Sequence, residues 1–376
     1  MSEARRGRGR TRLTVAFAAM VTLALVAALA CDGWRALGAS GTRAKVLACD
    51  DSDLTTLGHV RYGTQMLNVE LLDAPWRGYK SRAANVVRGQ MELDTLYRPG
   101  DTLLVTRPGS APEEDTLTAR TPWRLGAILG AFALFAVLLV AFGGAVGLQA
   151  LLSFVFCCLV MWRVAIPLML QGVSASLVAF AATCLMTAAI MLLVGGWTRK
   201  ALAAFGGSLL GVAAALGLAR LFGALMGVNG ATLPFVQTLV YSGFAQLDLA
   251  DVFVAATVLA ASGAMMDLAM DIAAGVREVA RHNPALPGRE LLLSGLRIGR
   301  ATVGTMTTTL LLAYSGGYLS LLMVFAAQGT PWAVFLNSPL VAAEVAKTLV
   351  GSFALVLVAP LTALLSAALF RPRSPR

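Results

Sequence analysis

Residues 125–197 read LGAILGAFALFAVLLVAFGGAVGLQALLSFVFCCLVMWRVAIPLMLQGVSASLVAFAATCLMTAAIMLLVGGW, and they contain one charged residue, Arg163. A bilayer core about 30 Å thick needs about 20 mostly apolar residues in a helix, because lipid leaves free backbone groups without partners. The stretch is far too apolar for a soluble core and too long for one helix. It therefore predicts several membrane spans that fold back on one another.

The same criterion, applied to both sides of this stretch, predicts about eight spans. They lie near 13–31, 125–142, 148–170, 174–195, 201–224, 249–275, 302–326 and 348–370. The predicted fold class is a membrane all-α protein, with a small β-rich extracytoplasmic domain between the first and second spans. The predicted domains are a basic tail with the first span (1–31), the β-rich domain (32–121), a seven-helix membrane bundle (122–370) and a basic tail (371–376).

The composition agrees with a membrane protein, since 57% of the residues are hydrophobic and 13% are charged. The net charge of +10 comes from basic residues beside apolar stretches, and no basic run carries interleaved aromatic residues. We interpret this charge as a topology signal and expect the lipid bilayer, not nucleic acid, as partner.

Orientation follows from the short loops, because Lys and Arg gather on the cytoplasmic side. Basic residues fall in 1–12, 196–200, 277–300 and 371–376, which places both termini in the cytoplasm. An alternative for the first span is a cleavable signal peptide, because Ala28-Leu29-Ala30 precedes Cys31. Cleavage would leave seven spans.

Residues 32–121 form the one long polar segment. Leu67, Val69 and Leu71 alternate with Asn68 and Glu70, which is typical of a half-buried strand. We expect a small β-barrel or sandwich, OB-like, that caps or docks, since it lacks an aromatic platform for nucleic acid. Cys31 and Cys49 are a candidate disulfide.

Ionisable residues within spans are rare and costly, so Asp267 and Asp271 are functional candidates. They lie one turn apart, and a rise of 1.5 Å per residue puts them roughly 13 and 8 Å inside the membrane. Thr305, Thr308 and Thr309 of the next span lie at the same depth. Such oxygen groups suit a hard cation, a proton relay or a hydrogen-bonded solute.

A structural reading of these residues stays open. Arg300 could pair with Asp271, and a threonine in a helix often donates its hydroxyl to its own preceding turn. The candidate gating residues also have a purely structural interpretation, because Gly316, Gly317 and Pro360 can each be routine helix interruptions.

Glu344 and Lys347, three residues apart, are expected to form a local ion pair, and Arg163 and Arg220 to extend toward the interface. The sequence contains no phosphate loop, nucleophile triad or metal-type spacing. We therefore expect no enzyme, no cofactor and no metal site.

The C-terminal half carries a recognisable series of motifs: GAMMDLAMDI (263–272), RELLLSGLRIGRATVGTMTTTLLLAYSGG (289–317) and AAEVAKTLVGSFALVLVAPLTALL (342–365). In this order, with GGWTRKALAAFGGSLLGV (195–212), they resemble the YibE/F family of bacterial polytopic membrane proteins. The chain departs from the family pattern in having Ala301 where Asp is usual, Thr308 where Asn is usual, and Asp271 where Ser is more frequent. The resemblance implies a bacterial inner-membrane protein, but the family is known mainly as membrane proteins of undefined function.

Together these features predict a permease-like protein for a small solute or ion, with a polar site between the sixth and seventh spans. The rival hypothesis is a non-transporting anchor or scaffold for envelope assembly or signalling. A third is the membrane subunit of a larger assembly, with a cytoplasmic partner at 277–300 or a second copy of the chain.

Overall fold

The computed structural model describes residues 41–91, 93–106 and 116–371. The chain divides into two compact units, one ending at Phe142 and one beginning at Gly143, and each is described by itself. The predicted first span, Cys31 and the C-terminal tail from residue 372 lie outside the described residues.

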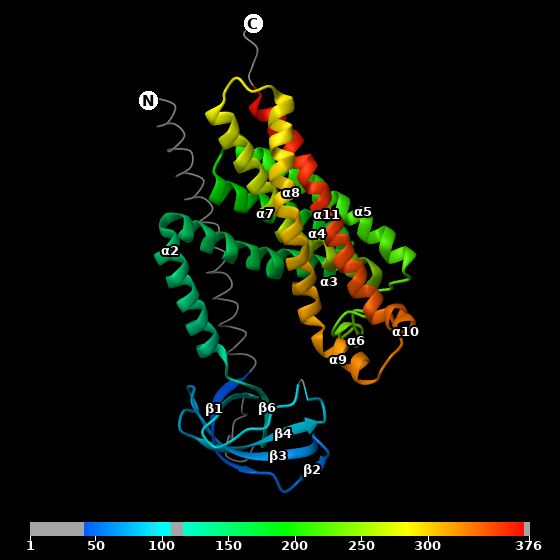
Figure 1. The fold of residues 1–376 in the computed structure, drawn as a ribbon. Coiled ribbons are helices and arrows are strands. Elements are labelled where there is room, and N and C mark those ends of the chain that lie inside the picture. The colour runs from blue at the N-terminus through cyan, green and yellow to red at the C-terminus, as the bar shows by residue number, and fades with distance from the viewer. Residues whose placement is uncertain (1–40, 92, 107–115, 372–376) are drawn as a thin grey trace. The chain divides into compact units, whose positions relative to one another are not determined.

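The first unit contains a six-stranded sheet (Figure 1). Its strands are β1 (Thr42–Asp50), β2 (Leu54–Leu57), β3 (Val60–Leu71), β4 (Lys80–Arg88), β5 (Thr102–Val105) and β6 (Thr116–Pro122). Five of them close in the cyclic order β1-β3-β4-β6-β5, in which only β4 and β6 are parallel, and β2 extends the β3 edge as a hairpin. This small five-stranded barrel has the topology of an OB-fold and confirms the expectation of a small β-rich domain.

The alternating pattern explains β3. Leu67, Val69 and Leu71 are fully buried in the barrel core, whereas Asn68 is exposed and Glu70 half-buried. These side chains fall on opposite faces because neighbouring residues of a strand point in opposite directions.

A buried polar network closes one end of the barrel. Gln65 donates to Asp51 Oδ1 at 2.8 Å and to the Tyr97 carbonyl at 3.0 Å, and its Oε1 accepts from Asn85 Nδ2 and from the Tyr97 amide. The Cys49 thiol is free and donates to the Tyr97 carbonyl at 3.3 Å. The segment around Tyr97 is therefore held by side chains from three strands.

The first of the described helices is α2 (Leu125–Val160), which starts in the first unit and ends in the second. A π-helical turn (Met161–Ala165) and α3 (Ile166–Leu170) continue it. Gly144 interrupts α2 with φ 55° and ψ −128°, a conformation that glycine tolerates because it has no Cβ. The break falls between the predicted spans 125–142 and 148–170.

The remaining helices are α4 (Ala175–Gly195), α5 (Arg199–Leu225), α6 (Val236–Tyr241), α7 (Leu249–His282), α8 (Gly288–Gly317), α9 (Leu319–Ala327), α10 (Trp332–Asn337) and α11 (Pro339–Phe370). Among the described residues, five segments are long and apolar enough to cross a membrane: 125–170, α4, α5, α7 and α11. The pair α8 and α9, bent by 69° at Tyr318, makes a sixth if it is one span. Most bounds lie within a few residues of the predicted ones, but α7 ends seven residues later, α8 begins fourteen residues earlier and α11 begins nine residues earlier than predicted. The count of eight stays a prediction.

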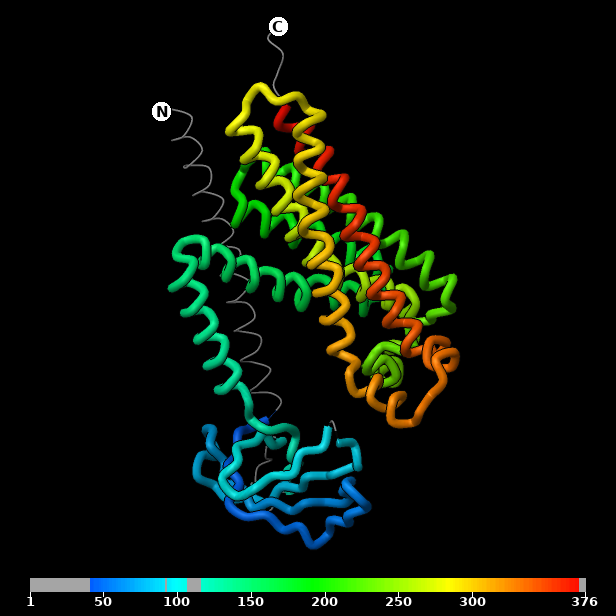
Figure 2. The backbone as a smooth tube through the Cα atoms, viewed as in Figure 1, coloured from blue at the N-terminus to red at the C-terminus, as the bar shows by residue number. Residues whose placement is uncertain are grey.

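Helix α11 packs against α5, α7 and α8, and α7 packs against α5 and α8, with α4 against α5 and α7 (Figure 2). Small residues allow this close approach. A Cβ at Gly207 of α5 would overlap Thr362 of α11, and one at Gly211 would overlap Val358. Gly295 and Gly299 of α8 face Ala363 and Ala359 of α11 in the same way, so α11 packs closely against two neighbours. Pro360 lies inside α11 without ending it.

Candidate functional site

The α7–α8 pair has an antiparallel register that can be read from its close contacts. A Cβ at Gly275 of α7 would lie 2.6 Å from Ile298 of α8, and one at Gly295 would lie 2.9 Å from Val276. One and two turns from Gly275 on the same face of α7 are Asp271 and Asp267.

On α8, steps of one turn from Ile298 along the face toward α7 reach Thr302, Thr305 and Thr309. The register therefore puts Asp271 near the level of Thr302 and Asp267 near the level of Thr305. We name Asp267, Asp271, Thr305, Thr308 and Thr309 the α7–α8 polar face, and all five are exposed.

Within the described residues, neither Asp267 nor Asp271 has a hydrogen bond or an ion pair, and neither pairs with Arg300. The threonine hydroxyls bond to their own helix: Thr305 donates to the Thr302 carbonyl at 2.9 Å, Thr308 to that of Gly304 at 3.3 Å and Thr309 to that of Thr305 at 3.0 Å. The structure thus brings the predicted residues to one face of two adjacent helices, but no hydrogen bond joins the carboxylates to the hydroxyls.

Four of the predicted gating residues lie at the α8–α9 bend or in an ion pair of α11, whereas among the described residues no contact brings Arg300 or Pro360 to them. Gly316 and Gly317 end α8 at the 69° bend, and the expected ion pair forms between Glu344 and Lys347, with Nζ and Oε1 2.6 Å apart. Only 12% of the Lys347 side chain and 15% of the Glu344 side chain are exposed.

Aromatic residues from other helices surround this pair. The Lys347 ammonium lies 5.5 Å from the ring centre of Tyr318 at the bend and 5.7 Å from that of Phe253 on α7. Among the described residues, the buried Tyr314 hydroxyl has no hydrogen-bond partner. The helix break and the buried ion pair therefore belong to one cluster, which we name the bend cluster.

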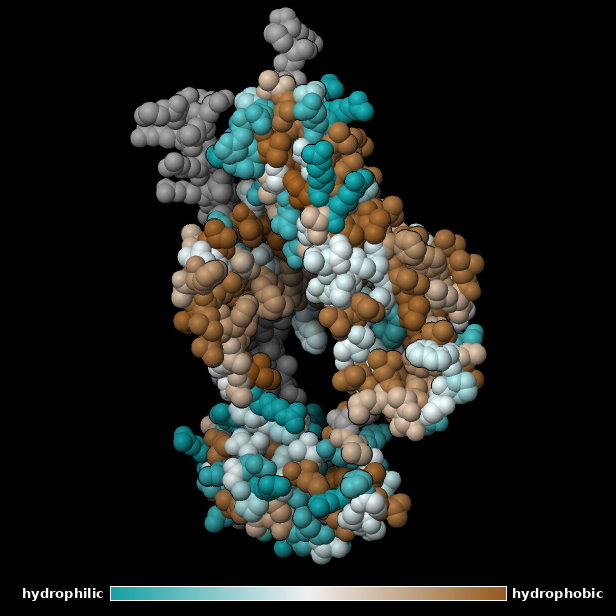
Figure 3. Space-filling view, viewed as in Figure 1, coloured by the Kyte–Doolittle hydropathy of each residue, from teal (hydrophilic) through white to brown (hydrophobic). Residues whose placement is uncertain are grey.

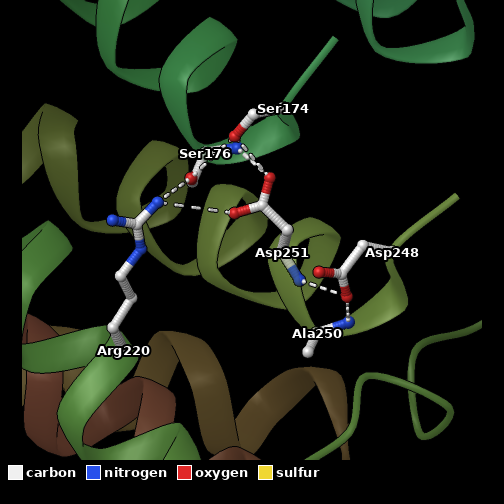
Figure 4. Close-up of polar contacts among 6 residues, drawn as sticks. All are labelled: Ser174, Ser176, Arg220, Asp248, Ala250 and Asp251. Carbon is white, nitrogen blue, oxygen red and sulfur yellow. Dashed lines mark hydrogen bonds and ion pairs between the residues drawn. The ribbon is translucent and has the colours of Figure 1, made fainter. Parts of the chain in front are cut away.

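A second charged group joins three helices (Figure 4). Asp251 at the start of α7 accepts from the Ser174 hydroxyl at 2.7 Å and the Ser176 amide at 3.0 Å. Arg220 of α5 donates to the Ser176 hydroxyl at 2.8 Å and lies 3.8 Å from the Asp251 carboxylate. Asp248, the N-cap of α7, accepts from the amides of Ala250 and Asp251.

Sequence reasoning missed this group. It expected Arg220 to extend toward the interface and did not single out Asp251, Ser174 or Ser176. One signal was available: Arg220 and Asp251 are ionisable residues at the same predicted end of two consecutive spans, where pairing lowers the cost of both charges.

The surface of the helical unit separates by polarity. Hydrophilic residues gather at the end where α7 and α8 are joined, and hydrophobic residues cover much of the rest of the face in view (Figure 3). The joined end carries Arg277, Arg281, Arg289, Arg297 and Arg300. Among the described residues no group of three or more His, Cys, Asp or Glu could hold a metal ion.

Long apolar helices packed through small residues, with few charges between them, define a polytopic membrane protein. Comparison with protein families gives a match to the model of YibE/F-like proteins over residues 131–372. The chain belongs to this family, as its motifs indicated. Neither the curated proteins nor the solved structures contain a match.

Proposed function

We propose that this protein is a permease for a small solute or ion, with eight spans and both termini in the cytoplasm. The segment 125–170 supports this count, because its 46 residues would make about 69 Å of helix, more than twice a bilayer core of about 30 Å. If the segment is divided at Gly144, it makes the second and third spans. The sequence 13–31 is the proposed first span.

The observation that carries the proposal is the α7–α8 polar face. Asp267 and Asp271 lie within a spanning helix, exposed and without an ion-pair partner among the described residues. A charged side chain facing lipid is expensive, so such residues line water-filled cavities or bind ligands. The threonines beside them add oxygen atoms at the same depth, which suits a cation or a hydrogen-bonded solute.

The bend cluster supports the part of the proposal in which one half of the broken helix moves. Broken helices and buried charges occur together at many transporter sites, since a break frees backbone groups and lets half of a helix move. In this proposal Gly316 and Gly317 form the hinge, and the Glu344–Lys347 pair holds α11 to the bend.

Transport is tested with a substrate-loss and accumulation screen in a deletion strain, complemented by the wild-type chain or by Asp267→Asn. We expect Asp267→Asn to abolish the transport phenotype at normal abundance. Glu278→Gln is the matched control, because Glu278 is an exposed carboxylate on the same helix that pairs with Arg281 outside the polar face. Full activity of both Asp267→Asn and Asp271→Asn would refute the site and favour the scaffold.

Hydration of the face is a separate measurement. In a cysteine-free background, Thr308→Cys should react with a membrane-impermeant maleimide, whereas Leu210→Cys on the exposed apolar side of α5 should not. Equal protection of both cysteines would place the threonine face in lipid and contradict the proposal.

A further inference from the structure

The Arg220–Asp251 group borders a pocket of about 410 Å³ at the end of the helical unit opposite the α7–α8 loop. This volume lies in the range of small-molecule sites, about 300–1,000 Å³. The pocket is also lined by Gly223, Ala224, Gly227, Val228 and Phe253. The small residues Gly223 and Ala224 of α5 leave the space open.

The lining of the pocket offers hydrogen-bond donors. The Arg220 guanidinium uses one nitrogen for Ser176 and Asp251, and in the described chain its other two nitrogens have no hydrogen-bond partner. Asn229 also lines the pocket, and its Oδ1 accepts from the Ala231 amide, which leaves the amide nitrogen available. A planar guanidinium edge is the group that binds a carboxylate with two parallel hydrogen bonds.

The lining also offers a negative charge. Asp251 is occupied by Ser174, Ser176 and Arg220, so it positions the guanidinium and does not face a ligand alone. Asp248 uses only Oδ1 to cap α7, and within the described residues its second oxygen has no hydrogen-bond partner. A guanidinium and a free carboxylate oxygen thus line one pocket, and Asp248 in its lining is about 28 Å along α7 from Asp267.

We propose that this pocket binds a small zwitterion, of amino-acid to dipeptide size. Arg220 and Asn229 bind its carboxylate, Asp248 binds its ammonium group, and Phe253 and Val228 contact its apolar part. Donors and a carboxylate in one lining favour a zwitterion. A simple cation would leave the guanidinium edge unused, and a simple anion would be repelled by the Asp248 carboxylate.

The test is isothermal titration of the full-length protein in lipid nanodiscs. Alanyl-alanine and alanine are the probes, alaninamide lacks the carboxylate, and propionate lacks the ammonium group. We expect binding of a zwitterionic probe, and binding at least about tenfold weaker for both truncated probes, since each loses a charge-assisted hydrogen bond.

Two variants locate the binding. Asp248→Asn keeps the helix cap, because Asn caps as well as Asp, and should weaken the zwitterion about tenfold or more while leaving propionate unchanged. Arg220→Lys keeps the charge but loses the planar fork, and should weaken the zwitterion and propionate alike.

The proposal is overturned if no zwitterionic probe binds at millimolar concentrations, if alaninamide binds as tightly as alanine, or if Asp248→Asn leaves the affinity unchanged. Because binding is measured without transport, loss of activity in Asp267→Asn with intact zwitterion binding would support both proposals. Zwitterion binding in a chain that transports nothing would refute only the permease.

Discussion

The Glu344–Lys347 pair allows a quantitative test of burial in the bend cluster. Glu344→Gln removes one partner of an ion pair whose side chains are 15% and 12% exposed, and leaves the Lys347 ammonium buried. Removing one partner of a buried pair costs about 3–5 kcal/mol. The rings of Phe253 and Tyr318 still contact the ammonium, so we expect the lower half of this range, about 3 kcal/mol.

A surface pair provides the matched control. Glu278 and Arg281 have the same three-residue spacing and nearly the same distance, 2.7 Å, but are 54% and 68% exposed. Glu278→Gln should change the free energy of unfolding by no more than about 1 kcal/mol. The two pairs differ mainly in burial.

The assay is denaturant unfolding of the full-length protein in lipid, with the double variant Glu344→Gln/Lys347→Met included. That variant removes both charges and should recover most of the lost stability, because the cost lies in the unpaired charge. The reasoning is refuted if Glu344→Gln costs no more than Glu278→Gln, or if the double variant is less stable than the single one.

Three further predictions concern packing, acid stability and topology. Gly207→Ala should lower the free energy of unfolding by about 1–3 kcal/mol, because the new Cβ overlaps Thr362, whereas Gly217→Ala on the same helix meets nothing within 4 Å and should be neutral or slightly stabilising. Burial acts to raise the pKa of Asp73, but hydrogen bonds and charge from Arg43 outweigh it and hold the pKa below its usual value. The stabilisation of the barrel by ionised Asp73 should be present above about pH 4 and lost as the pH falls further. Asp73→Asn should therefore remove this part of the acid dependence of barrel unfolding. Reporter fusions at Lys200 and Pro287 should show cytoplasmic signals and one at Ser110 an external signal, and an external signal at Lys200 would overturn the order of spans.

Features that depend on hydropathy or on local spacing could be predicted from the sequence. The bounds of α4, α5 and the start of α7 follow closely from hydropathy, because lipid leaves a helix no other way to satisfy its backbone. Strand β3 follows from period-two alternation, and the Glu344–Lys347 pair follows from its spacing within one helix turn.

Features set by packing between distant segments could not be predicted. Ser174 and Asp251 are 77 residues apart, and nothing local in either segment indicates the other. The burial of Lys347 depends on Phe253 and Tyr318, which come from α7 and the α8–α9 bend. The exposed carboxylates of α7 were found from the sequence because a charge in a span is anomalous by itself.

The closed barrel has a consequence for crowding. Each of its five strands pairs with a neighbour on both sides along at least part of its length, so among the described strands only β2, four residues long, has one edge wholly unpaired. Copies of a membrane protein are confined to two dimensions, where domains on the same side meet often and a long free edge would template intermolecular sheets. Closure shortens the backbone edges open to such pairing, so loops and side chains are the main means by which this domain can recognise anything else.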